Sequence, residues 1–161
     1  MPDPRPLISI VIPVKNAEPW LEKTLNAIFK QTLILQTEII AIDSGSSDQT
    51  RAILDRFAVR VLSIPPHEFN HGLTRNLGVR ESQGKYVVMT VQDAEPADPL
   101  WLENLMAGFT DETVAGVCGN QVVPHDLDKN PIDWYRPVSK PKMRRIQFPD
   151  VADFMAMSPE E

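Results

Sequence analysis

The chain has 161 residues, of which 42% are hydrophobic and 24% charged, and its formal net charge at pH 7 is -6. This length and balance are typical of one globular domain, and the negative charge argues against a nucleic-acid partner. The N-terminal segment Met-Pro-Asp-Pro-Arg-Pro lacks the apolar core of a signal peptide, and no apolar run is long enough to span a bilayer. We therefore expect a cytoplasmic protein, with peripheral attachment to the inner face of a membrane left open.

Strand-like and helix-like segments alternate along the chain, which predicts an α/β fold with a Rossmann-like, mostly parallel sheet and helices on both faces. The expected strands are short apolar runs at residues 7–12, 38–42, 59–64, 86–91 and 114–123. The expected helices follow Pro19, follow a cap at Ser47 or Asp48, and cover residues 74–82 and 99–109. The one cysteine, Cys118, lies in an apolar run, so we expect it to be buried.

The character of the sequence changes after Val123. Residues 124–161 are rich in proline, which disfavours continued helices and central strands. The last residues, Ser158-Pro-Glu-Glu161, are typical of a helix start with a capping serine. We expect residues 1–123 to form the α/β core and residues 124–161 to be a loop and the opening of a further portion.

Polar residues follow three of the expected strands at the point where each ends. They are Pro13-Val-Lys-Asn16, Asp43-Ser-Gly-Ser-Ser-Asp48 and Gln92-Asp-Ala-Glu95. Ligands of open α/β sheets bind outside the carboxyl ends of the strands, so the three segments predict a site. Turn and cap chemistry explains the serines and Asp48 of the second segment. It does not require Asp43, which we expect to accept a hydrogen bond from a ligand.

The segments Ser9-Ile-Val-Ile-Pro-Val-Lys-Asn16 and Asp43-Ser-Gly-Ser-Ser-Asp-Gln-Thr50 together resemble the opening of family 2 glycosyltransferases, which have the GT-A fold. In these enzymes, the ends of the first two strands hold the base and ribose of a nucleotide-sugar donor. The resemblance therefore implies a nucleoside pocket lined by Pro13, Lys15, Asn16 and Asp43.

A further segment, Phe69-Asn-His-Gly-Leu-Thr-Arg-Asn-Leu-Gly78, is similar to the rhamnosyltransferase-like branch of the family. The similarity implies that Arg75 and Asn76 also reach the donor, where the fixed positive charge of Arg75 would face the diphosphate or a ribose-binding aspartate. The alternative for Arg75 is a solvated position on a helix face.

The fourth expected strand ends in Val91-Gln-Asp93, where family 2 enzymes usually have Asp-x-Asp. The triplet Gln92-Asp-Ala94 is typical of the rhamnosyltransferase-like branch. The resemblance implies that Gln92 and Asp93 contact the donor, and that Asp93 holds Mg²⁺ or Mn²⁺ against the diphosphate. Glu95 either assists at the cation or faces solvent.

The reaction that the resemblance implies is the transfer of a sugar, rhamnose, from a nucleotide-diphosphate sugar to a saccharide or lipid-linked acceptor, with inversion, in cell-surface polysaccharide synthesis. Such a transfer needs a general base, which the family takes from a later segment. We expect that base beyond Glu161, so that residues 1–123 bind the nucleotide sugar and residues 124–161 begin a truncated acceptor-side portion. A nucleotide-binding module without turnover is the alternative.

The segment His67-Glu-Phe-Asn-His71 satisfies the zinc-protease pattern His-Glu-x-x-His. That chemistry needs both histidines on one face of a helix. Two prolines precede the segment and Gly72 follows it, so a chance match in a loop is the better interpretation, and a zinc hydrolase is the minor alternative. The sequence contains no glycine-rich phosphate loop of the nucleoside triphosphatase or dehydrogenase type.

Overall fold

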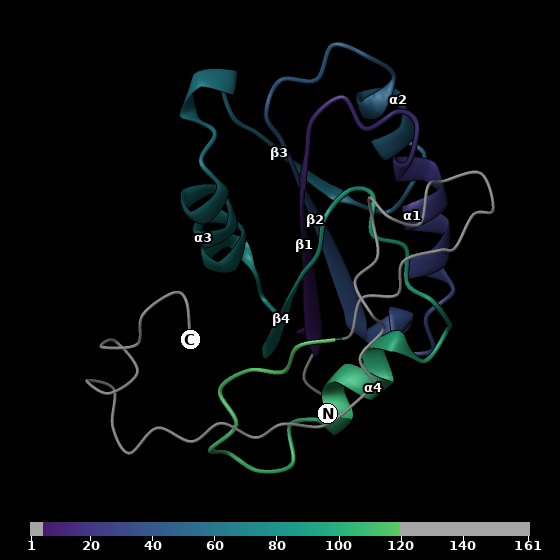
Figure 1. Ribbon diagram of the computed structural model, residues 1–161, viewed down its shortest axis with the longest axis vertical. Helices are drawn as coiled ribbons and strands as arrows, with labels where there is room; N and C mark the ends of the chain where they lie inside the picture. Colours follow the sequence, from purple (N-terminus) through teal and green to yellow (C-terminus); the bar gives the residue numbers. More distant parts are fainter. Residues whose placement is uncertain (1–4, 120–161) are drawn as a thin grey trace, which may run out of the picture. The chain divides into compact units, whose positions relative to one another are not determined.

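The computed structural model describes residues 5–119, and its sheet has four parallel strands in the order β3-β2-β1-β4 (Figure 1). The strands are β1 (Ile8–Val14), β2 (Thr37–Asp43), β3 (Arg60–Ser63) and β4 (Tyr86–Met89). Because they are parallel, their carboxyl ends lie at one edge of the sheet. The chain crosses from β1 to β2 and β3 on one side and returns to β4 on the other, so the strand order reverses beside β1.

Helices cover both faces of this sheet (Figure 1). The side that contacts Ile8, Ile10 and Ile12 of β1 carries α1 (Leu21–Phe29), α2 (Thr50–Leu54) and α4 (Trp101–Ala107). The other side, where Val11 is buried, carries α3 (His71–Glu81). Two short 3-10 helices are η1 (Ile34–Gln36) and η2 (Pro66–Glu68). The predicted α/β class, with a parallel sheet between helices, is confirmed.

Strand β1 continues two residues past its expected end, through Pro13. The carbonyl of Val14 accepts a hydrogen bond from Ser44 on the β2 side, whereas the carbonyl of Val11 accepts one from Thr90 on the β4 side. The nitrogen of Pro13 therefore faces the side of β4, and β4 has already ended there. A proline is tolerated in this central strand because no neighbour needs its missing N–H.

Helix α3 begins three residues earlier than expected and lies close to the sheet. The side-chain oxygen of Asn70 accepts hydrogen bonds from the N–H groups of Gly72 and Leu73, which makes Asn70 the N-cap. A Cβ atom on Gly78 would lie 2.3 Å from Cγ1 of Val11, so only glycine permits this close approach of helix and strand. The cap and the glycine thus place the start of α3 near the carboxyl edge.

The expected strand at residues 114–123 is wrong over its described part, because residues 114–119 form no strand. Val117 packs near Gly108, the residue that follows α4, rather than beside a sheet edge. Cys118 is exposed, so its expected burial is also wrong. Residues 120–123, and with them the proline-rich segment 124–161 and its expected helix start, lie outside the described residues. None of the helices described has the length and hydropathy needed to cross a membrane.

Candidate functional site

Three loops meet at the carboxyl edge of the sheet, and we call them the rim loops. They follow β1 (residues 15–20), β2 (residues 44–49) and β4 (residues 90–100). They carry four of the eight candidate residues, which are Lys15, Asn16, Gln92 and Asp93. Asp43 is the last residue of β2. Because the edge lies beside the reversal of strand order, the rim loops enclose the usual ligand position of an open α/β sheet.

Asn16 joins the first rim loop to the second. Its N–H donates to Oγ of Ser46 at 2.9 Å, and its side-chain oxygen accepts from the N–H of Ser47 at 2.9 Å. Its φ is 47°, in the left-handed region that asparagine tolerates better than most residues. The loop after β2 needs Gly45, whose φ is 81° and where a Cβ atom would lie 2.6 Å from Cγ of Pro66.

Further hydrogen bonds continue this pairing of the two loops into α2. The N–H of Ala17 donates to the hydroxyl of Thr50 at 2.6 Å, and the N–H of Glu18 donates to the carboxylate of Asp48 at 3.1 Å. The carboxylate of Glu18 in turn accepts from the N–H of Gln49. Asp48 also accepts from the N–H of Thr50 at the start of α2. The expected turn role of this segment agrees with the observed contacts. The expected cap at Ser47 or Asp48 is wrong in position, because the N-cap of α2 is Gln49, whose side chain makes no cap hydrogen bond.

The same contacts lower the pKa of Asp48. Desolvation acts to raise the pKa of its carboxyl group, but hydrogen bonds from Thr50, from the N–H of Glu18 and from its own N–H outweigh desolvation and leave the pKa below its ordinary value. Asp48 is therefore held as a carboxylate that links the two loops.

Asp43 is almost fully buried, with 7% of its surface exposed at the end of β2. Its Oδ1 accepts hydrogen bonds from the N–H of Ser46 at 3.0 Å and from the Ser46 hydroxyl at 2.6 Å. Within residues 5–119 its other oxygen, Oδ2, has no hydrogen-bond partner. A buried carboxylate normally has its oxygens satisfied, so the free Oδ2 is a ready acceptor for a ligand at the rim.

Gln92 links the third rim loop to the first. The N–H of Lys15 donates to Oε1 of Gln92 at 2.8 Å, and Nε2 of Gln92 donates to the Lys15 carbonyl at 3.3 Å. The hydroxyl of Thr24 on α1 donates to the backbone carbonyl of Gln92 at 3.0 Å. Lys15 itself is exposed.

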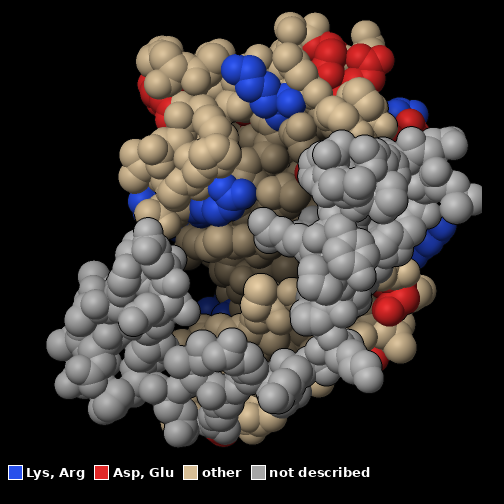
Figure 2. All heavy atoms as spheres, viewed as in Figure 1, with Lys and Arg blue, Asp and Glu red and all other residues tan. Residues whose placement is uncertain are grey.

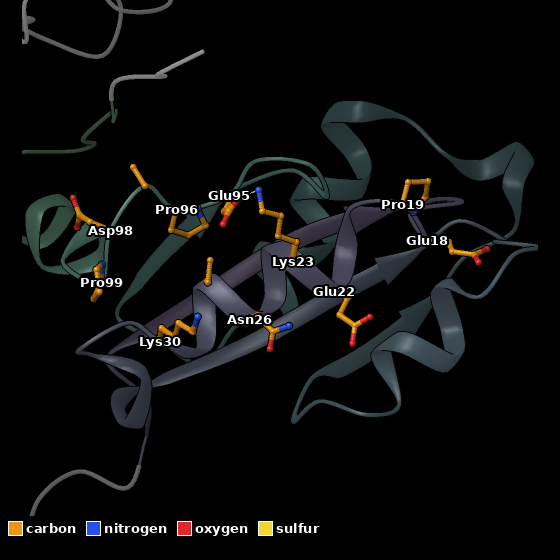
Figure 3. Close-up of a pocket in the computed structure, with 12 residues that line it drawn as sticks. Glu18, Pro19, Glu22, Lys23, Asn26, Lys30, Glu95, Pro96, Asp98 and Pro99 are labelled. Atoms are coloured by element: carbon orange, nitrogen blue, oxygen red, sulfur yellow. Dashed lines mark ion pairs between the residues drawn. The ribbon is translucent and has the colours of Figure 1, made fainter. Parts of the chain in front are cut away.

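Asp93, the next residue, is exposed in a turn and its carboxylate makes no hydrogen bond within the described part of the chain. Of the two positions expected for Glu95, the structure agrees with the solvent-facing one, because Glu95 is exposed. It forms an ion pair with Lys23 of α1, at 2.6 Å, and points toward that helix (Figure 3). Asp93 therefore stays the carboxylate of this loop that is available to a cation.

Arg75 and Asn76 lie in α3. The guanidinium of Arg75 is half-buried and donates to the His71 carbonyl at 2.9 Å, and among residues 5–119 it makes no ion pair. The structure thus does not join Arg75 to Asp43. Asn76 is exposed. In the space-filling view, lysine and arginine side chains lie among uncharged atoms on this face of the described residues (Figure 2).

The histidines of the His-Glu-x-x-His segment lie on different elements. His67 belongs to η2, and its Nε2 lies 3.8 Å from Oε1 of Glu68. His71 is the first residue of α3, and its ring contacts the ring of Phe69. Among the described residues, no group of three histidine, cysteine, aspartate or glutamate side chains is placed to hold a metal ion. The single helical face that a zinc-protease site needs is not formed.

A separate hollow of about 640 Å³ lies between the outer face of α1 and the segment from Glu95 to Pro99 (Figure 3). Side chains of both signs line it, among them Glu22, Lys23 and Lys30. None of the candidate ligand-binding residues contributes to its lining. We therefore assign no donor contact to this hollow.

Sequence reasoning did not identify Glu18, Thr24 and Thr50 as residues that fix the rim loops. Thr24 and Glu18 have partners 68 and 30 or 31 residues away, so no local pattern marks them. Thr50 is the final residue of the Asp-Ser-Gly-Ser-x-Asp-x-Thr segment, which is a usable signal.

Residues 9–156 match the protein family described as glycosyl transferase family 2. The chain belongs to this family. It is 39% identical over 127 residues to the O-antigen chain rhamnosyltransferase RfbN of Salmonella typhimurium, covering 78% of this chain and 40% of that protein. It is 37% identical over 126 residues to the O-antigen chain rhamnosyltransferase WbaN of Salmonella anatum, covering 76% of this chain and 39% of that protein. The family 2 chain thus spans about two fifths of the length of these relatives.

Solved structures of other proteins also resemble this chain. The mannosyltransferase PcManGT from Pyrobaculum calidifontis, in complex with GDP-Man and Mn²⁺, superposes with a TM-score of 0.60 at 28% identity, over 71% of this chain and 36% of that one. Glucosyl-3-phosphoglycerate synthase from Mycobacterium tuberculosis, in complex with Mn²⁺, UDP and phosphoglyceric acid, superposes with a TM-score of 0.58 at 27% identity, over 69% of this chain and 41% of that one. TarS of S. aureus shares the fold, with a TM-score of 0.57 at 22% identity, over 63% of this chain and 32% of that one. The expected GT-A fold is confirmed.

Proposed function

We propose that this chain is the donor-binding part of an inverting glycosyltransferase. The donor is a nucleotide-diphosphate sugar, the sugar is rhamnose, and the acceptor is a saccharide or lipid-linked saccharide of a cell-surface polysaccharide. Membership of family 2 and the two rhamnosyltransferase relatives support the reaction class and the sugar. The observation that carries the proposal is the free Oδ2 of buried Asp43, which lies at the same carboxyl edge of the sheet as the loop that bears Asp93.

The nucleoside is held at the ends of β1 and β2. Oδ2 of Asp43 accepts a hydrogen bond from a ring N–H of a uracil or thymine base, or from a ribose hydroxyl. The carboxamide oxygen of Asn16 already accepts from Ser47, so its NH₂ group remains to donate to the ligand. Pro13 and Lys15 complete the wall of this pocket from β1 and its loop.

The diphosphate lies toward α3 and the β4 loop. Arg75 uses one N–H on the His71 carbonyl, and the remaining guanidinium N–H groups are free to donate to phosphate oxygens. Asn76 follows Arg75 on α3 and offers a further amide donor.

A single carboxylate fits a cation that is shared with the ligand. Mg²⁺ typically keeps several waters and is bound through one or two carboxylates plus substrate phosphates, so Asp93 suits it where no cluster of protein ligands is described. A bound Mg²⁺ or Mn²⁺ would offset the negative charge that develops on the departing nucleotide. The Mn²⁺ in two of the related structures supports Mn²⁺ as the first ion to test.

Calorimetric titration of the whole chain with UDP, dTDP and GDP, each with and without Mn²⁺, tests the proposal. We expect saturable binding of a pyrimidine nucleoside diphosphate that tightens when Mn²⁺ is present. A folded sample that binds none of the three at millimolar concentration would refute the donor site. Tighter binding of GDP than of UDP and dTDP would refute the choice of base.

A further inference from the structure

Gln92 lies at the junction of the first and third rim loops, where the strand order of the sheet reverses. The hydrogen-bond ladder between β1 and β4 ends with the N–H of Thr90 donating to the Val11 carbonyl at 3.1 Å. Beyond that point, the carboxamide of Gln92 replaces the ladder, because it accepts from the N–H of Lys15 and donates to the Lys15 carbonyl. A side chain thus supplies the donor and acceptor that a further strand residue would have supplied.

These contacts leave the carboxamide little capacity for a ligand. Its oxygen and its NH₂ group both face the backbone of Lys15, and the backbone carbonyl of Gln92 receives the hydroxyl of Thr24. A donor molecule that bound the carboxamide would have to displace protein hydrogen bonds on both of its ends. The geometry therefore disfavours Gln92 as a direct ligand of the nucleotide sugar.

We propose that Gln92 is a positioning residue, which fixes the loop of Asp93 against the loop of Asn16. This inference rests on the proposed function, because it concerns the cation that Asp93 holds. Within residues 5–119, the carboxylate of Asp93 has no hydrogen bond of its own, so its place depends on the neighbouring backbone. Gln92 holds that backbone to the first loop, which Asn16 in turn holds to the loop after Asp43.

The consequence is a fixed distance between the nucleoside end and the cation end of the site. A cation can join the carboxylate of Asp93 to a diphosphate only if the nucleoside and Asp93 are held at compatible positions. Misplacement of a reacting or binding group by about 1 Å can cost roughly a hundredfold in an enzyme site. Loss of the Gln92 contacts should therefore weaken the contribution of the metal to binding while sparing the contribution of the nucleoside.

The hydrogen bonds themselves are tested by amide hydrogen exchange, measured by NMR on the whole chain. In Gln92→Ala, the exchange of the Lys15 amide should accelerate by roughly fivefold, the effect of about one net hydrogen bond. Gln36→Ala, which removes an exposed glutamine just before β2, is the matched control and should leave Lys15 unchanged. Equal Lys15 exchange in wild type and Gln92→Ala would overturn the inference.

The positioning role is tested by the metal dependence of nucleotide affinity. For each variant, the Kd for UDP or dTDP without Mn²⁺ is divided by the Kd with Mn²⁺. We expect Gln92→Ala, and Gln92→Met as a variant that keeps the side-chain volume, to reduce this ratio at least threefold while the metal-free Kd stays within about twofold of wild type. Asp93→Ala should bring this ratio to about one, because Mn²⁺ would no longer improve binding.

The outcomes separate the alternatives. A weaker metal-free Kd in both Gln92 variants would show that Gln92 contacts the donor, and a lower melting temperature with an unchanged ratio would show a merely structural residue. Either result overturns the inference and leaves the proposed function intact. Absence of nucleotide binding by the wild type would refute the proposed function and the positioning role with it, whereas the Lys15 exchange would still decide whether the contact exists.

Discussion

Replacement of Asn16 by alanine and, separately, by glycine divides the two reasons for an asparagine at this turn. Asn16 has φ of 47° and accepts a hydrogen bond from the N–H of Ser47. Both variants lose the carboxamide, but only alanine retains a Cβ atom in the left-handed region. The pair therefore separates the loss of the hydrogen bond from the cost of the backbone conformation.

The magnitudes follow from these two contacts. Loss of one hydrogen bond costs about 0.5–1.5 kcal/mol, and a Cβ atom in the left-handed region costs about 1–2 kcal/mol. Glycine avoids the second cost but adds about 0.4–1 kcal/mol through the greater entropy of the unfolded chain. Because asparagine already bears the cost of its own Cβ atom, we expect Asn16→Ala to lower the free energy of unfolding by about 0.5–1.5 kcal/mol, the loss of the hydrogen bond. Asn16→Gly also removes the Cβ cost, which roughly offsets the lost hydrogen bond and the added entropy, so we expect it to be more stable than Asn16→Ala and close to wild type.

Urea unfolding followed by circular dichroism measures both values, provided that the m-value is unchanged. Asn26→Ala is the matched control, because Asn26 is exposed within α1, where alanine is the better helix former. It should be neutral or slightly stabilising. The reasoning would be refuted if Asn16→Ala were as stable as Asn16→Gly, or if neither variant differed from wild type.

Three further predictions concern binding, packing and pH. Asp43→Ala should weaken UDP or dTDP binding about ten- to a hundredfold even without metal, whereas Asp93→Ala should lose only the gain in affinity given by Mn²⁺. Calorimetry that found the same metal dependence in both variants would contradict the assigned roles. Gly78→Ala should cost about 1–3 kcal/mol in urea unfolding, because its Cβ atom would collide with β1, and Gly116→Ala, with nothing within 4 Å of the added atom, is its control. Because the pKa of Asp48 is lowered on folding, its stabilising contribution is present above the unfolded pKa and disappears as the pH falls through the lowered value. Asp48→Asn should therefore reduce the acid dependence of stability, and an NMR titration that places the Asp48 pKa at or above its ordinary value would contradict this.

The sequence was sufficient for the order and type of the elements because each described strand and helix carries its own local signal. The β-branched run of β1 and the helical spacing of Leu21, Leu25 and Ile28 required no knowledge of neighbours. The rim was predictable for the same reason, since the strand ends and the polar residues after them are local features. Asp43 was singled out because the cap chemistry did not need it. In the structure its Oδ1 serves the turn at Ser46, and the ligand contact of its free Oδ2 stays a prediction.

Other features depend on partners that lie far along the chain, and these could not be read from local patterns. The carboxamide of Gln92 meets the backbone of Lys15, 77 residues away, so its type alone could not distinguish a ligand contact from a loop contact. Pro13 stays within β1 because of where β4 ends. The expected strand from residue 114 rested on an apolar run, and the packing of Val117 near α4 overrode that pattern.

The reciprocal hydrogen bonds between the first two rim loops have a kinetic consequence. With Asn16 fixed by Ser46 and Ser47, and Asp43 fixed by Ser46, the nucleoside pocket that we propose has its shape before any ligand arrives. Little conformational entropy remains to be lost there when a nucleotide binds. Association at this end should therefore follow a single concentration-dependent phase whose rate is set by diffusion and orientation, without a slow ordering step of the loops after β1 and β2.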